Sequence, residues 1–215
     1  MKELDINNLN QITGNINSLF ESLIKKRLYN NTFDKSKFLS IIKASLLSED
    51  KNLRKVGAKL VRRLRLIEFI DYIRPLLNDN DPTVRAVSIL ALAQMKDLDS
   101  FNKIKEIYFN DIIPVKTSAL MYFGVIENQE SKNILIDALK NGNEDLKENA
   151  FQGLTWHTKD HDFNLMKSFI LKELSNPYLV SKFIKNLVVV NKPEVVQFLE
   201  ELILKTDISE YVILS

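Results

Sequence analysis

Both histidines and the only tryptophan of the chain lie together in the segment Trp156-His157-Thr158-Lys159-Asp160-His161-Asp162. His157 and His161 have the i, i+4 spacing with which two imidazoles on one helix bind a metal ion, and Asp160 or Asp162 would add an oxygen ligand. The segment follows the apolar pattern of a helix, however, and its polar composition is more typical of a turn. A turn would not hold the imidazoles at helical spacing. We therefore expect no metal and no cofactor, and His157 and His161 are the two candidate ligands to check.

Other catalytic signatures are missing from the sequence. The chain has no cysteine, which excludes disulfides, thiolate zinc sites and a cysteine nucleophile. It has no GxSxG motif and no glycine-rich loop that would cradle a phosphate. We expect a protein that is not an enzyme.

The composition favours an all-helical, soluble protein. The 215 residues include only five glycines and five prolines, too few for the hairpins of a sandwich or barrel. The N-terminus lacks the apolar run of a signal peptide, and no run of about 18 apolar residues occurs. We expect a cytoplasmic protein that does not bind membranes.

The sequence repeats itself with a constant period of about 31 residues, the step from Leu53 to Val84. An apolar residue followed by a basic one recurs at this spacing, as Leu53-Arg54, Val84-Arg85, Val115-Lys116 and Leu146-Lys147. A small residue follows each pair at a constant distance, namely Gly57, Ser88, Ala119 and Ala150. A fifth copy begins at Leu179, after a slightly longer step. Regular self-similarity of this kind indicates stacked structural units.

Each unit is predicted to be a helical hairpin. The apolar spacing predicts helices between the repeated ones, over 38–47, 67–78, 101–110, 131–140, 163–174 and 193–205. Pro82 suits a first helical turn, and Ser131 and Asn143 offer N-cap oxygens. One hairpin cannot bury its apolar faces alone, so neighbours must stack. We predict an all-α fold, an α–α superhelix of about five to six hairpins.

The run Asp81-Pro82-Thr83-Val84-Arg85, followed by small Ser88 and then Ala91-Leu92, resembles the HEAT repeat in its short bacterial form. The resemblance covers residues 36–207, about five repeats, and implies a HEAT-like solenoid. It also implies a ladder of Asp–Arg contacts between units, for which the matching residues are Asp50/Arg54, Asp81/Arg85, more loosely Asp111/Lys116, and by type alone Glu144 or Asp145 with Lys147. It implies no single activity, because the family includes scaffolds, lyase-related proteins and DNA glycosylases.

The two ends of the chain depart from the repeat. Residues 1–35 match no copy, and an amphipathic helix over 8–28 with a following loop is predicted to cap the solenoid. The solenoid itself is expected over 36–215, as one continuous domain with its cap. The C-terminal residues DISEYVILS would form a short closing helix or a tail that docks elsewhere.

A strip of positive charge runs along the helix that starts near residue 51. On a helical wheel of about 100° per residue, Leu53, Gly57 and Val61 gather on the side that must face the core. The opposite side carries Lys51, Lys55, Lys59, Arg62 and Arg65. Residues 51–65 hold seven basic residues and no acid. In proteins of this resemblance the second helix of each unit lines the concave face, so we expect the strip to lie there.

The repeat predicts how this lining changes from unit to unit. The positions of Lys55, Lys59 and Arg62 become Ala86, Leu90 and Ala93, then Thr117, Met121 and Gly124, then Glu148, Gln152 and Thr155. Whole-chain charge changes in the same direction, from 19 basic and 13 acidic residues in 1–110 to 11 and 15 in 111–215.

Leu90 and Met121 are apolar residues at positions that are predicted to face the groove. We expect them to be covered, either by a binding partner or by another part of the chain. Our hypothesis is a non-enzymatic adaptor or regulatory protein whose groove binds a polypeptide with acidic and apolar residues, through Lys55, Lys59, Arg62, Arg65, Leu90 and Met121. In the alternative, neighbouring second helices bury these residues mutually, or the N-terminal helix fills the groove.

Nucleic acid is the rival partner. Lys25-Lys26-Arg27 and the strip from Lys51 to Arg65 are able to meet phosphates. A pI near 8.6 and an acidic C-terminal half argue against this partner. A relationship to HEAT-like alkylpurine DNA glycosylases would need a carboxylate and aromatic rings in a basic cleft, whereas Trp156 lies in the less basic half.

Overall fold

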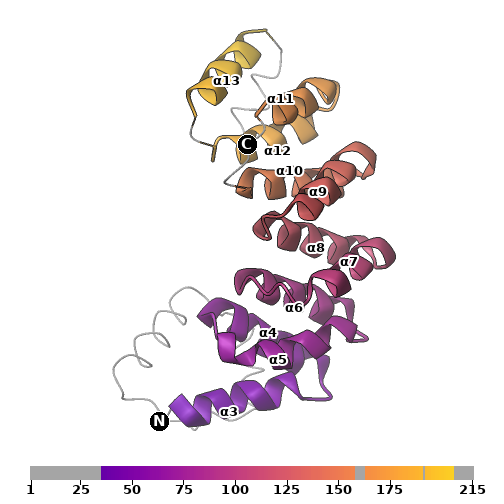
Figure 1. Ribbon diagram of the computed structural model, residues 1–215, viewed down its shortest axis with the longest axis vertical. Helices are drawn as coiled ribbons and strands as arrows, with labels where there is room; N and C mark the ends of the chain where they lie inside the picture. The colour runs from indigo at the N-terminus through magenta and orange to yellow at the C-terminus, as the bar shows by residue number, and fades with distance from the viewer. Residues whose placement is uncertain (1–34, 158–162, 191, 206–215) are drawn as a thin grey trace. The chain divides into compact units, whose positions relative to one another are not determined.

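The computed structural model describes residues 35–157, 163–190 and 192–205. The chain divides into two compact units, Met1–Ala119 (unit 1) and Leu120–Ser215 (unit 2), and helix α8 (Ile113–Val125) contains the boundary. All regular secondary structure in the described residues is helical, which confirms the predicted all-α class (Figure 1). No helix in these ranges has both the length and the apolar character needed to cross a membrane. The predicted capping helix over 8–28 and the C-terminal DISEYVILS lie outside the described residues.

Unit 1 is built on helices that pack in sequence order. Helix α3 (Lys35–Leu46) packs on α4 (Lys51–Leu64), and α4 packs on α6 (Pro82–Gln94), with α7 (Phe101–Asn110) following. The apolar side of α4 is buried as the wheel predicted, since Leu53, Gly57 and Val61 are all buried. The first two copies of the repeat therefore belong to helices α4 and α6, which lie against each other.

The segment 67–78 departs from the predicted single helix. It forms a 3₁₀ turn (Ile67–Phe69), a four-residue helix α5 (Ile70–Ile73) and a second 3₁₀ turn (Arg74–Asn78). Pro75 supplies the physical reason, because it has no amide hydrogen to donate to the preceding turn. The apolar spacing alone could not show this break, and Phe69, Ile73 and Leu76 are still buried as a helix would bury them.

Side-chain caps set the starts of the helices. Asp50 and Asp81 accept hydrogen bonds from the first amides of α4 and α6, and Asn143 does so for α10. The N-cap prediction was wrong for Ser131. Asn128 caps α9 instead, and Ser131 lies in its first turn with a buried hydroxyl that has no hydrogen-bond partner.

Two helices of unit 1 end in the same unusual way. Arg65 after α4 and Lys96 after α6 both have a φ of 53°, in the left-handed region. In each case two successive amides bond back to the last turn, Arg65 to Arg62 and Leu66 to Val61, and one repeat later Lys96 to Ala93 and Asp97 to Leu92. This is the Schellman arrangement, in which glycine normally takes the left-handed position.

Unit 2 contains α9 (Gln129–Asn141), α10 (Glu144–Trp156), α11 (Phe163–Lys172), α12 (Pro177–Leu187) and α13 (Pro193–Lys205). Helix α10 packs on both α9 and α12, and Phe151 stacks on Phe183 with ring centroids 4.2 Å apart. The backbones of α8 and α10 meet at two glycines. A Cβ atom on Gly124 would lie 2.6 Å from the Cα atom of Gly153, so neither position tolerates a side chain without movement.

Candidate binding surface on helices α4 and α6

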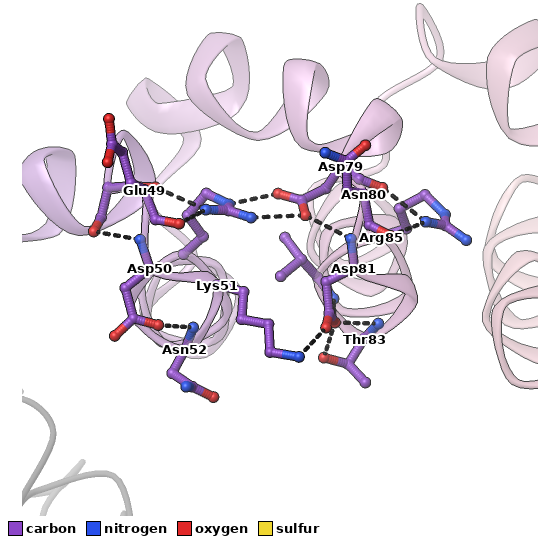
Figure 2. A network of polar contacts seen from close by, with 12 residues as sticks. Glu49, Asp50, Lys51, Asn52, Asp79, Asn80, Asp81, Thr83 and Arg85 are labelled. Carbon is purple, nitrogen blue, oxygen red and sulfur yellow. Dashed lines mark hydrogen bonds and ion pairs between the residues drawn. The ribbon is translucent and has the colours of Figure 1, made fainter.

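Apart from Arg63, the basic residues over 51–65 fall into two sets, and the first set links α4 to the start of α6. The Arg54 guanidinium donates to both carboxylate oxygens of Asp79, at 2.5 and 2.9 Å, and to the backbone carbonyls of Ser48 and Glu49. Lys51 forms an ion pair with Asp81, with 2.8 Å between Nζ and Oδ2. Figure 2 shows Asp79 and Asp81 at the start of α6, both facing the α4 side.

Arg85 repeats the contacts of Arg54 one unit later. Its guanidinium donates to both carboxylate oxygens of Asp111 at 2.7 Å, and to the carbonyls of Asp79 and Asn80. These carbonyls stand one repeat beyond those that Arg54 uses. The contacts form a ladder between successive repeats, but with acids other than the motif suggested for Arg54. Asp50 and Asp81 are occupied as N-caps, and Asp79 pairs with Arg54 in their place.

Electrostatics in the ladder favour the charged forms. Burial raises the pKa of Asp79, but the hydrogen bond from Arg54, that from the Asp81 amide and the Arg54 charge together hold it below its ordinary value. The hydrogen bond from Arg85 is the largest cause of the lowered pKa of Asp111. The ladder carboxylates are therefore ionised at neutral pH, and they are committed to structure.

The second set is Lys55, Lys59 and Arg62 of α4, together with Arg65 at the C-cap of the helix. Lys59 and Arg65 are exposed, and Lys55 and Arg62 are half-buried. None of the four has a carboxylate partner within the part of the chain that the structure describes. Lys55 lies 3.3 Å from the Asn52 side-chain oxygen, and the Arg65 Nε atom lies 3.2 Å from the Gln94 amide.

Apolar residues take the positions on α6 that are equivalent to those of Lys55 and Lys59 on α4. Leu90 and Ala86 are half-buried and stand one repeat beyond Lys59 and Lys55, on the helix that packs against α4. Leu90 is thus neither sealed in the core nor fully exposed. The third position predicted to line the groove is different, because Ala93 is 5% exposed and is taken up by packing.

The equivalent positions in unit 2 also include both half-buried and buried residues. Met121, the other predicted contact residue, is half-buried. Gly124 was predicted to line the groove, yet it is buried against Gly153 and Trp156, and Thr155 is 5% exposed. That part of the prediction was wrong. A wheel drawn for one isolated helix does not show that neighbouring helices also cover its far side.

A shallow polar pocket of about 330 Å³ lies beside the ladder in unit 1, lined by residues that include Asp79, Arg85, Lys103, Glu106 and Asp111. Its charged side chains have partners in one another or in Arg54: Arg85 with Asp111, Lys103 with Glu106 at 3.1 Å, and Asp79 with Arg54. The pocket is therefore better explained as a surface of the ladder than as a ligand site.

One charged cluster was not predicted from the sequence. Arg74 donates to Asp97 at 2.5 Å and to Asp99 at 2.6 Å, and lies 3.3 Å from Asp71. Asp97 is buried and also accepts a hydrogen bond from the Ser100 hydroxyl at 2.6 Å. No sequence signal joins Asp97 and Asp99 to Arg74, because they lie 23 and 25 residues from it along the chain.

Of the two histidines considered as metal ligands, the structure describes His157 alone. His157 is buried, with its Nε2 atom 3.1 Å from the backbone carbonyl oxygen of Phe123, and His161 lies outside the described residues. Within the described ranges no group of three or more metal-ligating side chains comes together. His157 thus has a structural hydrogen bond inside unit 2.

Comparison with known proteins assigns no family to this arrangement. No family model matches the chain, and no curated protein matches its sequence.

Proposed function

We propose that this chain is a non-enzymatic adaptor or regulatory protein built from HEAT-like repeats, and that it binds another polypeptide along helices α4 and α6. The repeat interpretation, a superhelical stack of short HEAT-like hairpins, is supported by contacts that recur at the repeat spacing. Arg54 and Arg85 clamp equivalent carbonyls, and Arg65 and Lys96 end their helices in the same conformation. Such recurrence is typical of stacked repeats, whose concave surfaces commonly bind extended partners.

The observation that carries the binding proposal is the division of the α4 cations. Lys51 and Arg54 are paired with acids of the next repeat, whereas Lys55, Lys59, Arg62 and Arg65 have no carboxylate partner in the described residues. A row of unpaired cations beside half-exposed apolar side chains on α6 matches a partner that carries both carboxylates and apolar residues. Leu90 would supply most of the apolar contact in unit 1.

The expected energetics assign different roles to the two kinds of residue. Full burial of an exposed leucine contributes about 1.5–3 kcal/mol, at about 25 cal/mol per Å² of apolar surface, and binding would add only part of this for Leu90 because it is already half-buried. An exposed ion pair contributes about 0–1 kcal/mol. Affinity would then depend on apolar contact and on any cation that is withdrawn from water, while the exposed lysines would select an acidic partner and speed its association.

The decisive experiment is affinity capture with a matched pair of charge variants. The full chain, its Lys55→Glu/Lys59→Glu variant and its Lys140→Glu/Lys172→Glu variant would be used as bait in nuclease-treated lysate at low and high salt. Lys140 and Lys172 are exposed on α9 and α11 and give the same change in net charge. We expect a defined set of proteins to be retained by the wild type and by the control, and to be lost from the α4 variant.

Two results would overturn the proposal. Retention of the same proteins by both variants would place binding elsewhere on the chain. If the wild type retains material from untreated lysate but none from nuclease-treated lysate, a nucleic-acid backbone is the partner of the strip.

A further inference from the structure

Arg62 differs from the other cations of α4 because it is partly withdrawn from water without an opposite charge. Its side chain is half-buried, whereas Lys59, on the preceding turn, is exposed. Arg54 is also half-buried, but it is fully supplied with acceptors by Asp79 and two backbone carbonyls. Within the described residues no carboxylate forms an ion pair with the Arg62 guanidinium, and its charged neighbour is the cation Arg63.

This environment disfavours the charge that Arg62 carries. Burial, and then repulsion from Arg63, lower the pKa of the Arg62 guanidinium from its ordinary value, although it stays protonated at neutral pH. Withdrawing a cation from water without pairing it destabilises the folded state. Residues that reduce stability in this way are concentrated at functional sites.

We propose that Arg62 is the anchor of the α4 surface and receives a carboxylate of the bound polypeptide. The inference rests on the proposed function and specifies its partner. An arginine can donate two parallel hydrogen bonds to a carboxylate, and a partly desolvated site makes each of them stronger than on the open surface. Part of the desolvation of Arg62 is already present before binding, so the incoming carboxylate gains the attraction while losing less to dehydration.

The apolar residues on helix α6, which packs against α4, favour a polypeptide over nucleic acid as the partner. Ala86 and Leu90 on the adjoining helix are apolar and half-exposed. Apolar side chains gain nothing from a phosphate backbone, but they pack well against the apolar side of an amphipathic segment. The bound segment is therefore expected to present a carboxylate to Arg62 and apolar side chains to Leu90.

The test combines thermal stability with binding of a defined probe. The probe is a fluorescent amphipathic peptide of glutamate and leucine at helical spacing, and its control carries glutamine in place of glutamate. For Arg62→Met we expect the melting temperature to rise by about 2–4 °C, because an unpaired cation is removed. Affinity for the glutamate peptide should fall at least about tenfold.

Two further variants separate the role of Arg62 from general charge. Lys59→Met removes an exposed cation from the same helix, and we expect no change in melting temperature and only about a twofold loss of affinity. Arg62→Lys keeps the charge but loses the planar fork of donors, so it should weaken binding without raising the melting temperature.

Each contrary result has a distinct meaning. If Arg62→Met unfolds or melts at a lower temperature, Arg62 has a stabilising partner within the chain, and the anchor proposal is wrong even if binding by α4 stands. If Arg62→Met is more stable but binds the peptide as the wild type does, Arg62 is not the anchor. If the wild type binds duplex DNA but neither peptide, the proposed function itself fails on this surface.

Discussion

Units 1 and 2 connect their helices through the same repeat position with different chemistry. In unit 1, Arg85 holds the Asp111 carboxylate with two donors and two backbone carbonyls with a third nitrogen. In unit 2, Lys147 stands at the corresponding position and contacts Glu173 through its single ammonium group. A guanidinium fixes direction as well as distance, whereas an ammonium acts as a point charge. The repeat therefore preserves a cross-helix contact without preserving the rigidity of that contact.

Acidification should give the largest effect, because it removes several carboxylates of unit 1 together. Burial raises the pKa of Asp79 and of Asp97, but the hydrogen bonds and charges of Arg54 and Arg74 outweigh it, and the Arg85 hydrogen bond lowers the pKa of Asp111. Folded-state pKa values below the unfolded value of about 3.9 stabilise the protein above that pH. This stability is lost as the pH falls through the folded values.

Chemical denaturation followed by circular dichroism, from about pH 6 to about pH 3, measures this loss. The Asp79→Asn/Asp111→Asn variant is the control. It should be less stable than the wild type at neutral pH, but its stability should fall less as the solution is acidified. The same acid dependence in both proteins would show that the ladder carboxylates do not set it.

Replacing Arg85 should lower the free energy of unfolding more than replacing Lys147, the corresponding residue of unit 2. Arg85→Met leaves the Asp111 carboxylate and the carbonyls of Asp79 and Asn80 without their donor, and we expect a loss of about 3 kcal/mol in the free energy of unfolding. Lys147→Met leaves the half-buried Glu173 carboxylate without its donor but strands no backbone carbonyl, and we expect a loss of about 1 kcal/mol. Urea denaturation of the two variants measures both values.

The single tryptophan makes this comparison sharper. Trp156 lies in unit 2, so its fluorescence follows that unit, whereas circular dichroism follows both. If Arg85→Met shifts the dichroism transition and leaves the fluorescence transition in place, the units unfold separately. Equal losses for the two substitutions would remove the distinction between fork and point charge.

Helix contact in unit 2 brings two glycine backbones together, whereas Gly57 of unit 1 faces the side chains of Ser45 and Leu46, and this is the second contrast between the units. The position of Ala93 in unit 1 is Gly124 in unit 2, where an added Cβ atom would lie 2.6 Å from the Gly153 Cα atom and 3.1 Å from the Trp156 ring. Alanine is the better helix former, by about 1 kcal/mol, but backbone atoms cannot yield to this overlap. We expect Gly124→Ala to lower the free energy of unfolding by about 2 kcal/mol.

The Gly124→Ala substitution should also change the emission of Trp156. The reverse change at the matched position, Ala93→Gly, is the control and should cost about 1 kcal/mol, because it reduces helix propensity and opens a small space without overlap. Greater stability of Gly124→Ala would mean that the two helices separate readily, and that close contact is not required.

Much of the helical framework could be predicted from the sequence. The apolar spacing placed α7 over 101–110 and α13 over 193–205 with the bounds that the structure has. The helical period and the first-turn prolines are local signals, and tertiary packing did not change the helix bounds that they predicted. The break at Pro75 was missed because apolar residues three apart, such as Ile73 and Leu76, fit an α-helix and a 3₁₀ turn alike.

The pairing of charges could not be predicted in the same way. The residues Asn78-Asp79-Asn80-Asp81 offer two acids, and the sequence does not say which of them caps α6 and which meets Arg54. Capping by Asp81 decides the question, because it leaves Asp79 to face the neighbouring helix. The candidate surface was likewise found only in part, since Lys59 is exposed as predicted while Gly124 is buried by a neighbour that the wheel does not contain.

The smallest effect should come from the left-handed helix ends, which also bear on the binding proposal. Among the described residues, positive φ values occur at Arg65 and Lys96, both in unit 1, whereas His157 after α10 has a φ of −71°. Glycine adopts the left-handed conformation without strain, so Lys96→Gly should raise the free energy of unfolding by about 0.5–1 kcal/mol.

Arg65→Gly should be stabilising to the same extent, as measured by urea denaturation, because the two residues occupy equivalent positions. Arg65 belongs to the proposed surface and Lys96 does not. If both variants are more stable but only Arg65→Gly loses affinity for the acidic peptide, then the cation after α4 serves binding at the expense of stability. If Arg65→Gly is destabilising, the contact of Arg65 with Gln94 outweighs the strain, and the residue belongs with the structural cations of α4.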